Sequence, residues 1–538
     1  MRSLAGTLTT AQKDPVNPLV KIRLTQGAND NTYLLTGTGF IYSMEHSEGR
    51  DSQKATVVLD NSEGTFDAKS YGEDMYKGVI SWGLVDANGA DQYSAAAPLY
   101  VVGQQFHSSP GYLLCILNLI GLFDLMAQDK ASEDYVLESS DTQTVKTLIT
   151  AVIGATIAPF YHCVGFTVTY DSEDSLIDSL KPADSFRIGL NDTRLDVVNR
   201  LMTLTKCAKR VEADGAVHIF VPAVDGPTWT VDTKQEINDY VQPTTPNNNF
   251  RYRCSAVAGD QKTAAVTEPT WPTVAGNTVV DDQVTWLAVA PDYEYTLDAG
   301  DHNFFKKSHR ERVVMPNFRK VESHPDSDPP LYTGTAEYKP SSDLTPPSPY
   351  NSAEIREFRY MRLTSDEEAA NVAAALLEGD RLDAERGSGS VPVNCGAEVL
   401  DYNKITDSRQ SGDIRIGNIG YLTRHYRPNL WEMRFGFGDP RQGGFLSLDL
   451  PGDVVATSLP SVGIEGERRI DIEGLSSILQ SLVTAVNRNA EEIRAIQVVF
   501  GGALFRLQAA ISSGQLQSVI DSLHVREILR IPVGTDKF

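Results

Sequence analysis

Apolar and polar positions alternate between residues 250 and 290, and this is the clearest pattern in the chain. The segment is rich in Val and Thr and is divided by Gly259, Pro269, Pro272 and Gly276. β-branched residues favour strands, whereas Gly and Pro favour the turns between strands. The pattern therefore predicts a small unit of short, half-buried strands joined by tight turns.

Tryptophan is the second feature of this segment. Trp271 and Trp286 lie inside the alternating pattern, and Trp229 precedes it. Large aromatic side chains bury enough area to organise a unit this small, so we expect Trp271 and Trp286 to supply most of its core. The alternative is a sugar-binding face, in which Trp229, Trp271 and Trp286 would contact a glycan.

Alternation of the strand type also occurs on both sides of this unit. It is present at 20–24 and 55–60 near the N-terminus, and it resumes at about 292 and continues through 412–438. The most apolar run, 112–126, is too short to span a bilayer and carries Asn118, which favours a buried strand. The chain is therefore predicted to be mainly β with minor α, an α+β class.

Helices are predicted at two capping boxes. Thr193-Arg-Leu-Asp196 opens one helix, and Thr364-Ser-Asp-Glu367 opens a second over 365–386. Asp214-Gly215 between apolar residues predicts a two-residue hairpin turn of type I′, which places His218 on the second strand. A lone histidine in such a strand is more often structural than catalytic. The prolines of 323–350 predict a linker.

The C-terminal region carries a different repeat, in which apolar residues recur at alternating intervals of three and four. This spacing predicts one seam of a coiled coil, with a polar Asn whose burial would fix register and oligomer state. A helix docked on its own domain is the alternative. The predicted seam consists of Leu479, Leu482, Val486, Asn489, Ile493, Ile496 and Phe500.

Length, charge and cysteine content exclude several classes of protein. A length of 538 residues predicts roughly three to five domains. The net charge of −23 argues against binding to the phosphate backbone of nucleic acid, so no sequence-specific nucleic acid is expected. Five widely spaced cysteines read as buried apolar residues, not as a disulfide framework or a zinc site. The N-terminus lacks an apolar secretory signal, so synthesis in a host cytoplasm is expected.

The chain contains none of the common catalytic motifs. There is no His-Glu-x-x-His, Walker loop, Gly-x-Ser-x-Gly or strand-bound Gly-x-Gly-x-x-Gly. His107 and His309 each have a serine close by in sequence, but adjacency in sequence is not the geometry of a catalytic triad. We therefore expect no enzyme activity, no catalytic residues, no cofactor and no metal.

Particular residue orders resemble proteins of bacteriophage tails. Arg251-Tyr-Arg-Cys-Ser255, Thr267-Glu-Pro-Thr-Trp-Pro272 and the strand ending at Trp286 resemble a small β module of phage tail proteins. The residues of 293–318, the helix after Thr364, the passage 385–392 and the segment 431–440 together resemble the baseplate hub, or tail-associated (tail tip) hub, family of tailed phages. The resemblance covers about residues 20–455 and lies in the order of degenerate motifs.

The resemblance implies several β-barrel or sandwich-like hub domains with an inserted module. The expected division is an N-terminal β domain, an α+β hub domain, an inserted small β module with a carbohydrate-binding alternative, a second hub β domain with the linker and the helix, and a C-terminal helical oligomerisation segment. These five parts cover residues 1–105, 106–227, 228–291, 292–455 and 456–538.

The resemblance also implies a function. The chain would be a structural virion protein, trimeric in the manner of such hubs, that closes the tail tube at the tail tip or baseplate and attaches fibres or tip proteins during host attachment and genome ejection. Its partners would be itself, as a homotrimer, and the tail tube or distal tail protein, the fibres and the tape measure, with no membrane span. The alternatives are a receptor- or glycan-binding tail fibre protein and, third, a tail-associated cell-wall hydrolase.

Overall fold

A computed structural model describes residues 2–438 with short gaps. The gaps are 14–16, 38, 65, 67–74, 110–111, 225, 245–249, 298–301, 305, 310–315, 326–328, 339–355, 385–386 and 410–413. In these residues the protein is mainly β with some helices, as the sequence predicts. The predicted seam at 479–500 lies outside the described residues.

One 15-stranded sheet contains strands from both ends of the described chain. Its main path runs β19-β18-β25-β26-β3-β4-β8-β7-β5-β1-β2, with β6, β20, β24 and β27 attached beside it. The N-terminal strands are β1 (Pro18–Gln26), β2 (Asn29–Tyr33), β3 (Ile41–Gly49), β4 (Ser52–Asp60), β5 (Lys77–Val85), β6 (Asp91–Ala95), β7 (Leu99–Ser109) and β8 (Tyr112–Gly121). The later strands are β18 (Tyr293–Thr296), β19 (His302–Asn303), β20 (Lys306–His309), β24 (Gly387–Val391), β25 (Tyr402–Thr406), β26 (Ile414–Arg427) and β27 (Leu430–Phe437).

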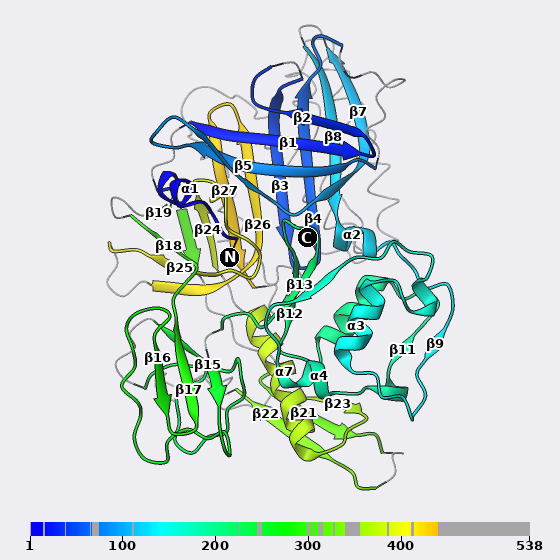
Figure 1. Cartoon of the computed structure of the whole chain (residues 1–538), viewed down its shortest axis with the longest axis vertical. Helices are drawn as coiled ribbons and strands as arrows, with labels where there is room; N and C mark the ends of the chain where they lie inside the picture. The colour runs from blue at the N-terminus through cyan, green and yellow to red at the C-terminus, as the bar shows by residue number, and fades with distance from the viewer. Residues whose placement is uncertain are drawn as a thin grey trace, which may run out of the picture. The chain divides into compact units, whose positions relative to one another are not determined.

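The junction between the two halves of this sheet is the pairing of β26 with β3. The strands are antiparallel, and the register places Thr423 opposite Ser47 and Arg424 opposite His46. In Figure 1 the yellow β26 and β27 lie beside the blue β3 and β4. One hydrophobic core, which we call the β-body core, lines the sheet and includes Trp82, Leu117 and Phe435. The short helix α1 (Gly6–Ala11) buries Leu8 in the same core.

The α+β region follows the first set of strands. Its helices are α2 (Leu122–Met126), α3 (Val145–Ile153), α4 (Ser175–Ser179) and α5 (Arg194–Met202), with 3-10 turns at Ala158–Phe160 and Ala183–Ser185. Its strands are β9 (Tyr135–Val136), β10 (Val168–Tyr170), β11 (Arg187–Ile188), β12 (Ala208–Val211) and β13 (Val217–Phe220). The run predicted as a buried strand is β8, which continues into α2.

Helix α7 (Asp366–Ala384) packs with this region. The helix contacts a small sheet made of β21 (Phe318–Ser323), β22 (Thr333–Glu337) and β23 (Arg356–Met361). Val372 and Ala373 of the helix share a hydrophobic core with Leu148 and Val198 of the α+β region. The described residues of 292–438 therefore contribute to two separate cores.

Two local predictions need correction. The helix at 366 is capped by Ser365, whose Oγ accepts from the Glu368 backbone N–H at 3.0 Å, so the capping residue lies one position later than expected. Residues 333–337 lie inside the expected linker but form β22, which pairs with β21. Successive side chains of a strand point to opposite faces, and β22 packs one of its faces against α7.

The hairpin at Asp214-Gly215 is present, but its turn differs from the prediction. Gly215 has a φ of +84°, while Asp214 is not among the residues with positive φ, so the turn is not type I′. The Glu212 N–H donates to the Ala216 carbonyl at 3.2 Å and the Gly215 N–H to the Glu212 carbonyl at 2.9 Å. These bonds describe a three-residue loop in which glycine takes the left-handed position.

The described residues of 229–289 contain a four-stranded antiparallel sheet, and we call this part of the chain the module. Its strands are β14 (Tyr240–Val241), β15 (Arg251–Val257), β16 (Thr278–Asp281) and β17 (Val284–Val289), in the order β14-β15-β17-β16. They are drawn in green in Figure 1. The module has a hydrophobic core of its own, and it touches the α+β region through Tyr240 and through the ion pair of Asp239 with Lys206 at 2.5 Å.

Candidate functional site

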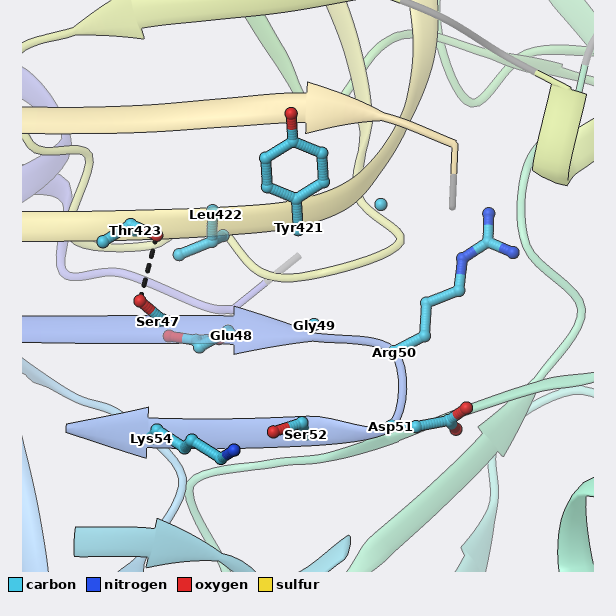
Figure 2. Close-up of a pocket in the computed structure, with 11 residues that line it drawn as sticks. Ser47, Glu48, Gly49, Arg50, Asp51, Ser52, Lys54, Tyr421, Leu422 and Thr423 are labelled. Carbon is cyan, nitrogen blue, oxygen red and sulfur yellow. Dashed lines mark hydrogen bonds between the residues drawn. The ribbon is translucent and has the colours of Figure 1, made fainter. Parts of the chain in front are cut away.

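A surface pocket lies where the β3–β4 hairpin meets β26. Its volume is about 260 Å³, and it is lined by residues 47–52, Lys54 and 420–423. Figure 2 shows Arg50 and Asp51 at the hairpin turn and Tyr421 on β26, with a hydrogen bond of 3.0 Å between the Ser47 and Thr423 hydroxyls. The lining contains no histidine or cysteine.

The charged residues of the hairpin turn are held by other elements. Arg50 pairs with Asp383 at the end of α7, and Asp51 pairs with Lys209 of β12. A second pocket of about 400 Å³ lies along these pairs and is lined in part by Arg319 and Asp380. Arg319 and Asp380 are also paired with each other, since the Arg319 Nε donates to Asp380 at 2.7 Å. These pairs position the hairpin, α7 and β12 relative to one another.

A third pocket, of about 600 Å³, is predominantly acidic. Its lining includes Glu173, Asp178, Glu236 and Glu367. Lys146 pairs with both Glu173, at 2.5 Å, and Asp178, at 3.2 Å. The pocket lining thus contains carboxylates that already have cationic partners.

A buried ion cluster joins three distant segments. Arg210 of β12 pairs with Asp401 at 3.0 Å and with Glu398 at 3.4 Å. Arg2 pairs with the same Glu398 at 3.1 Å. Burial raises the pKa of Asp401 to about 6. The cluster locks the N-terminal segment and the α+β hairpin onto the loop between β24 and β25.

A second buried cation lies in the β-body core. The Arg424 side chain is fully buried and contacts Glu48 of β3, the Ala397 carbonyl and, through Nε at 3.2 Å, the Asn394 carbonyl. Burial acts to raise the pKa of Glu48, but Arg424, His46 and Arg2 together outweigh it, so the pKa lies below its usual range. The ion pair therefore bridges the two halves of the sheet at its centre.

Two of the three candidate glycan contacts are buried in the module core. Trp286 is fully buried and Trp229 is 6% exposed. Both indole N–H groups donate to the same oxygen of Asp281, at 3.0 Å from Trp286 and 2.7 Å from Trp229. Neither ring has a face on which a sugar could stack in this structure.

Trp271 is the third candidate, and it is only partly buried. Its ring lies against Tyr252, with centroids 4.2 Å apart, and its indole N–H donates to Glu268 at 2.7 Å. Glu268 is the acidic residue of the Glu-Pro-x-Trp-Pro corner. The spacing of this corner lets the Glu268 carboxylate accept a hydrogen bond from the Trp271 indole. Trp271 is thus the one of the three candidate tryptophans that is partly exposed in this structure.

The histidines and cysteines singled out in the sequence have distinct environments. His218 lies between Asp171 and Asp214, an arrangement that the sequence did not reveal because Asp171 follows β10, 47 residues before His218. His107 contacts the Ser109 hydroxyl at 3.1 Å, and no side-chain environment is described for His309. Cys115, Cys207, Cys254 and Cys395 are buried thiols, as expected, and Cys163 is partly exposed.

Comparison with known proteins gives structural matches only. No protein-family model and no curated protein matches the chain. The tail protein from Neisseria meningitidis MC58 matches with a TM-score of 0.45 and 9% identity over 79% of this chain and 97% of that one. The 43 kDa tail protein of prophage MuSo2 from Shewanella oneidensis matches with a TM-score of 0.42 and 10% identity over 78% and 98%.

A third match comes from a bacterial secretion apparatus. It is an E. coli protein described as a component of the type VI secretion system with structural similarity to T4 bacteriophage tail proteins. The TM-score is 0.38 and the identity 8%, over 78% of this chain and 77% of that one. Separately, no helix in the described residues is long and apolar enough to cross a membrane. Because all three TM-scores lie below 0.5, the function proposed below rests on the residues of this chain.

Proposed function

We propose that this chain is a structural component of a bacteriophage tail, and that it acts as the hub that closes the tail tube at the tail tip and attaches fibres or tip proteins. The proposal agrees in class with the tail proteins named above, but it does not rest on them. It rests on the hub-like order of motifs in the sequence and on one structural observation, which is that segments before and after the module join in a single sheet.

That shared sheet supports a rigid scaffold of the hub kind. Strands from 18–121 and 293–437 share the β-body core, and the module leaves the body between them with a core of its own. A body built from sequence-distant strands resists local unfolding, because opening any one strand disrupts pairing with remote neighbours. Subunits that assemble into a ring would then use interfaces of more than about 2,000 Å² for an obligate contact.

Electron microscopy of the purified full chain tests the hub directly. The expected images show closed rings with threefold symmetry. Monomers or extended fibres at micromolar concentration would contradict the proposal and favour a fibre protein.

Self-association through the predicted C-terminal seam is part of this proposal. Deletion of residues 471–538 is expected to lower the subunit number measured by light scattering. Ile493→Asp should have the same effect because it places a charge in the seam, whereas Glu491→Gln, off the seam, should not. An unchanged mass after the deletion would show that the helix does not assemble the subunits.

A glycan-binding fibre protein is the second candidate, and the partial exposure of Trp271 is the observation that favours it. Binding of host envelope glycans to the full chain would be measured with the wild type, Trp271→Ala and Trp286→Ala. A folded Trp271→Ala variant that loses glycan binding would establish the fibre function.

The third candidate is a cell-wall hydrolase. The hub proposal expects no soluble fragments when the purified chain is incubated with peptidoglycan or host polysaccharide. Fragment release that disappears in His107→Ala or His218→Ala, but not in His162→Ala, would replace the structural function with a catalytic one.

A further inference from the structure

Three side chains of the types that bind metals meet beside the β12–β13 hairpin. They are Asp171, Glu212 and His218, and one ligand atom from each lies within 4.8 Å of the others. The hub function proposed above makes no use of them. The cluster cannot be recognised from the order of residues, because Asp171 is 47 residues from His218 along the chain.

Backbone pairing places these residues and does not depend on the side chains themselves. β10 pairs in parallel with β13, with Thr169 opposite His218, and the Asp171 N–H donates to the Ile219 carbonyl at 2.9 Å. β12 pairs with β13 and leads into the loop that carries Glu212. A three-stranded sheet therefore presents the three groups together before any ligand binds.

The imidazole of His218 has a carboxylate on each side. Nε2 lies 3.1 Å from Asp214 Oδ2, while Nδ1 lies 2.9 Å from Asp171 Oδ2 and 3.8 Å from Glu212 Oε2. When Nε2 carries the proton and donates it to Asp214, the lone pair of Nδ1 points toward the lone pairs of two carboxylates. Such lone pairs repel one another unless a proton or a metal cation lies between them.

Asp214 has the position of the partner that metal-binding histidines use. A metal-ligating histidine almost always donates its other ring N–H to a carboxylate, a carbonyl or water, and this bond fixes the tautomer. In this cluster Asp214 occupies that position on Nε2, on the opposite side of the ring from Asp171 and Glu212. A carboxylate at this position favours the tautomer in which the lone pair of Nδ1 can bind a metal.

The charge of the cluster also favours a cation. Arg210 donates to the other oxygen of Glu212, Oε1, from Nε at 2.8 Å and from Nη2 at 2.6 Å, but it is shared with Glu398 and Asp401. Glu212 Oε2 therefore faces His218 with its charge only partly balanced. Two further carboxylates, Asp171 and Asp214, add to the negative charge around the imidazole.

Access and distances fit a small cation. The side chain of His218 is 11% exposed and that of Asp171 is 42% exposed, so the site opens to solvent on the Asp171 side. Zinc holds nitrogen and oxygen ligands at about 2.0–2.2 Å, which places tetrahedral ligand atoms about 3.3–3.5 Å apart. The observed separations of 2.9 and 3.8 Å lie on either side of that range.

We propose that His218 Nδ1, Asp171 and Glu212 Oε2 bind one divalent transition-metal cation, with Asp214 as the positioning residue and water as the remaining ligand. An imidazole suits zinc and its neighbours in the first transition row, whereas calcium and magnesium prefer sites made entirely of oxygen. The cation would link β10 to the β12–β13 hairpin and, through Glu212 and Arg210, to the buried ion cluster at Asp401.

Calorimetric titration of the tag-free full chain with zinc chloride tests this proposal. One zinc per chain is expected, and His218→Asn and Asp171→Asn should each weaken binding by at least about 100-fold, beyond the loss from an outer partner. Asp214→Asn should weaken binding by about 10–100-fold, the usual effect of losing an outer-shell partner. His162→Asn, at an exposed histidine, is the matched control and should leave the affinity unchanged.

Thermal unfolding with and without zinc gives an independent measurement. Zinc should raise the melting temperature of the wild type but not of Asp171→Asn, whose exposed side chain can be changed without creating a cavity. Calcium chloride should produce neither saturable binding nor a shift. Absence of saturable zinc binding, equal affinity in the wild type and Asp171→Asn, or calcium binding as tight as zinc binding would overturn the proposal and leave a proton-bridged ion cluster.

Discussion

The β-body core and the module core each enclose a buried charged side chain, but they connect very different lengths of chain. In the body, Arg424 contacts Glu48, which lies 376 residues away. In the module, Asp281 accepts from Trp229, Trp286 and the Ala264 backbone N–H, at separations of 52, 5 and 17 residues. The body is thus held by contacts between remote segments, and the module by contacts within itself.

The signs of the two charges suit the groups around them. Arginine has five N–H donors, and in the body it faces two backbone carbonyls and a carboxylate. Aspartate only accepts when it is ionised, and in the module it faces two indole donors and a backbone N–H. Each charge therefore satisfies several buried polar groups that would otherwise lack partners, and removing either one should destabilise its own core.

The largest effect is expected for Arg424→Met. This change leaves Glu48 as a buried charge and two carbonyls without a donor, so the free energy of unfolding should fall by about 3–5 kcal/mol. The measurement is urea unfolding of the full chain. Arg434→Met, at a largely exposed arginine on β27, is the matched control and should cost about 0.5 kcal/mol or less. A loss below 1 kcal/mol for Arg424→Met would show that the pair does not hold the two halves together.

The second largest effect is a pH dependence of the stability of the body. His46 lies opposite Arg424, and burial lowers its pKa from 6.5 to about 4. Between these values the unfolded chain binds a proton that the folded chain does not, so stability falls as the pH is lowered from 6.5 toward 4, by about 3 kcal/mol in total.

His46→Leu should abolish this part of the pH dependence, because leucine does not titrate, while His162→Asn should keep it. Urea unfolding at several pH values between 4 and 7 measures the effect. The same slope in His46→Leu as in the wild type would assign the dependence to other groups, among them Asp401.

A smaller effect is expected for Asp281→Asn in the module. The asparagine amide nitrogen presents a donor where the carboxylate accepted bonds, so at least one buried N–H loses its acceptor at a cost of about 1–3 kcal/mol. Asp282→Asn, the exposed neighbour, is the control. Because Trp82 and Trp431 lie in the body, hydrogen exchange is measured separately on peptides of the module and on peptides of the body strands. An unfolding midpoint of the body that moved as far as that of the module would contradict a local effect.

The smallest effect on the body is expected from excision of residues 228–291 with a short Gly/Ser bridge. The two sets of body strands keep their partners, so cooperative unfolding of the body should remain. Lys206 would lose its partner Asp239, and the excised chain should therefore also carry Lys206→Met. Loss of all cooperative unfolding, seen by circular dichroism, would show that the module is integral to the body.

Features that depend on a few neighbouring residues could be predicted from the sequence. The start of α5 follows from Thr193, whose hydroxyl accepts from the Asp196 N–H at 3.1 Å. The hairpin at Gly215 was identified although its turn type was not, because the glycine marks a turn without fixing the φ of the residue before it. The buried environment of Trp286 follows from its place on an alternating strand.

Alternation, capping and turn residues act locally, and they were sufficient to predict the mainly β character and the position of several strands. Only the tertiary structure decided that β26 pairs with β3, that α7 packs on the α+β region, and that Asp171 meets His218. Those contacts depend on which remote segments come together. The spacing of residues along one strand or helix does not specify which distant segment will pack against it.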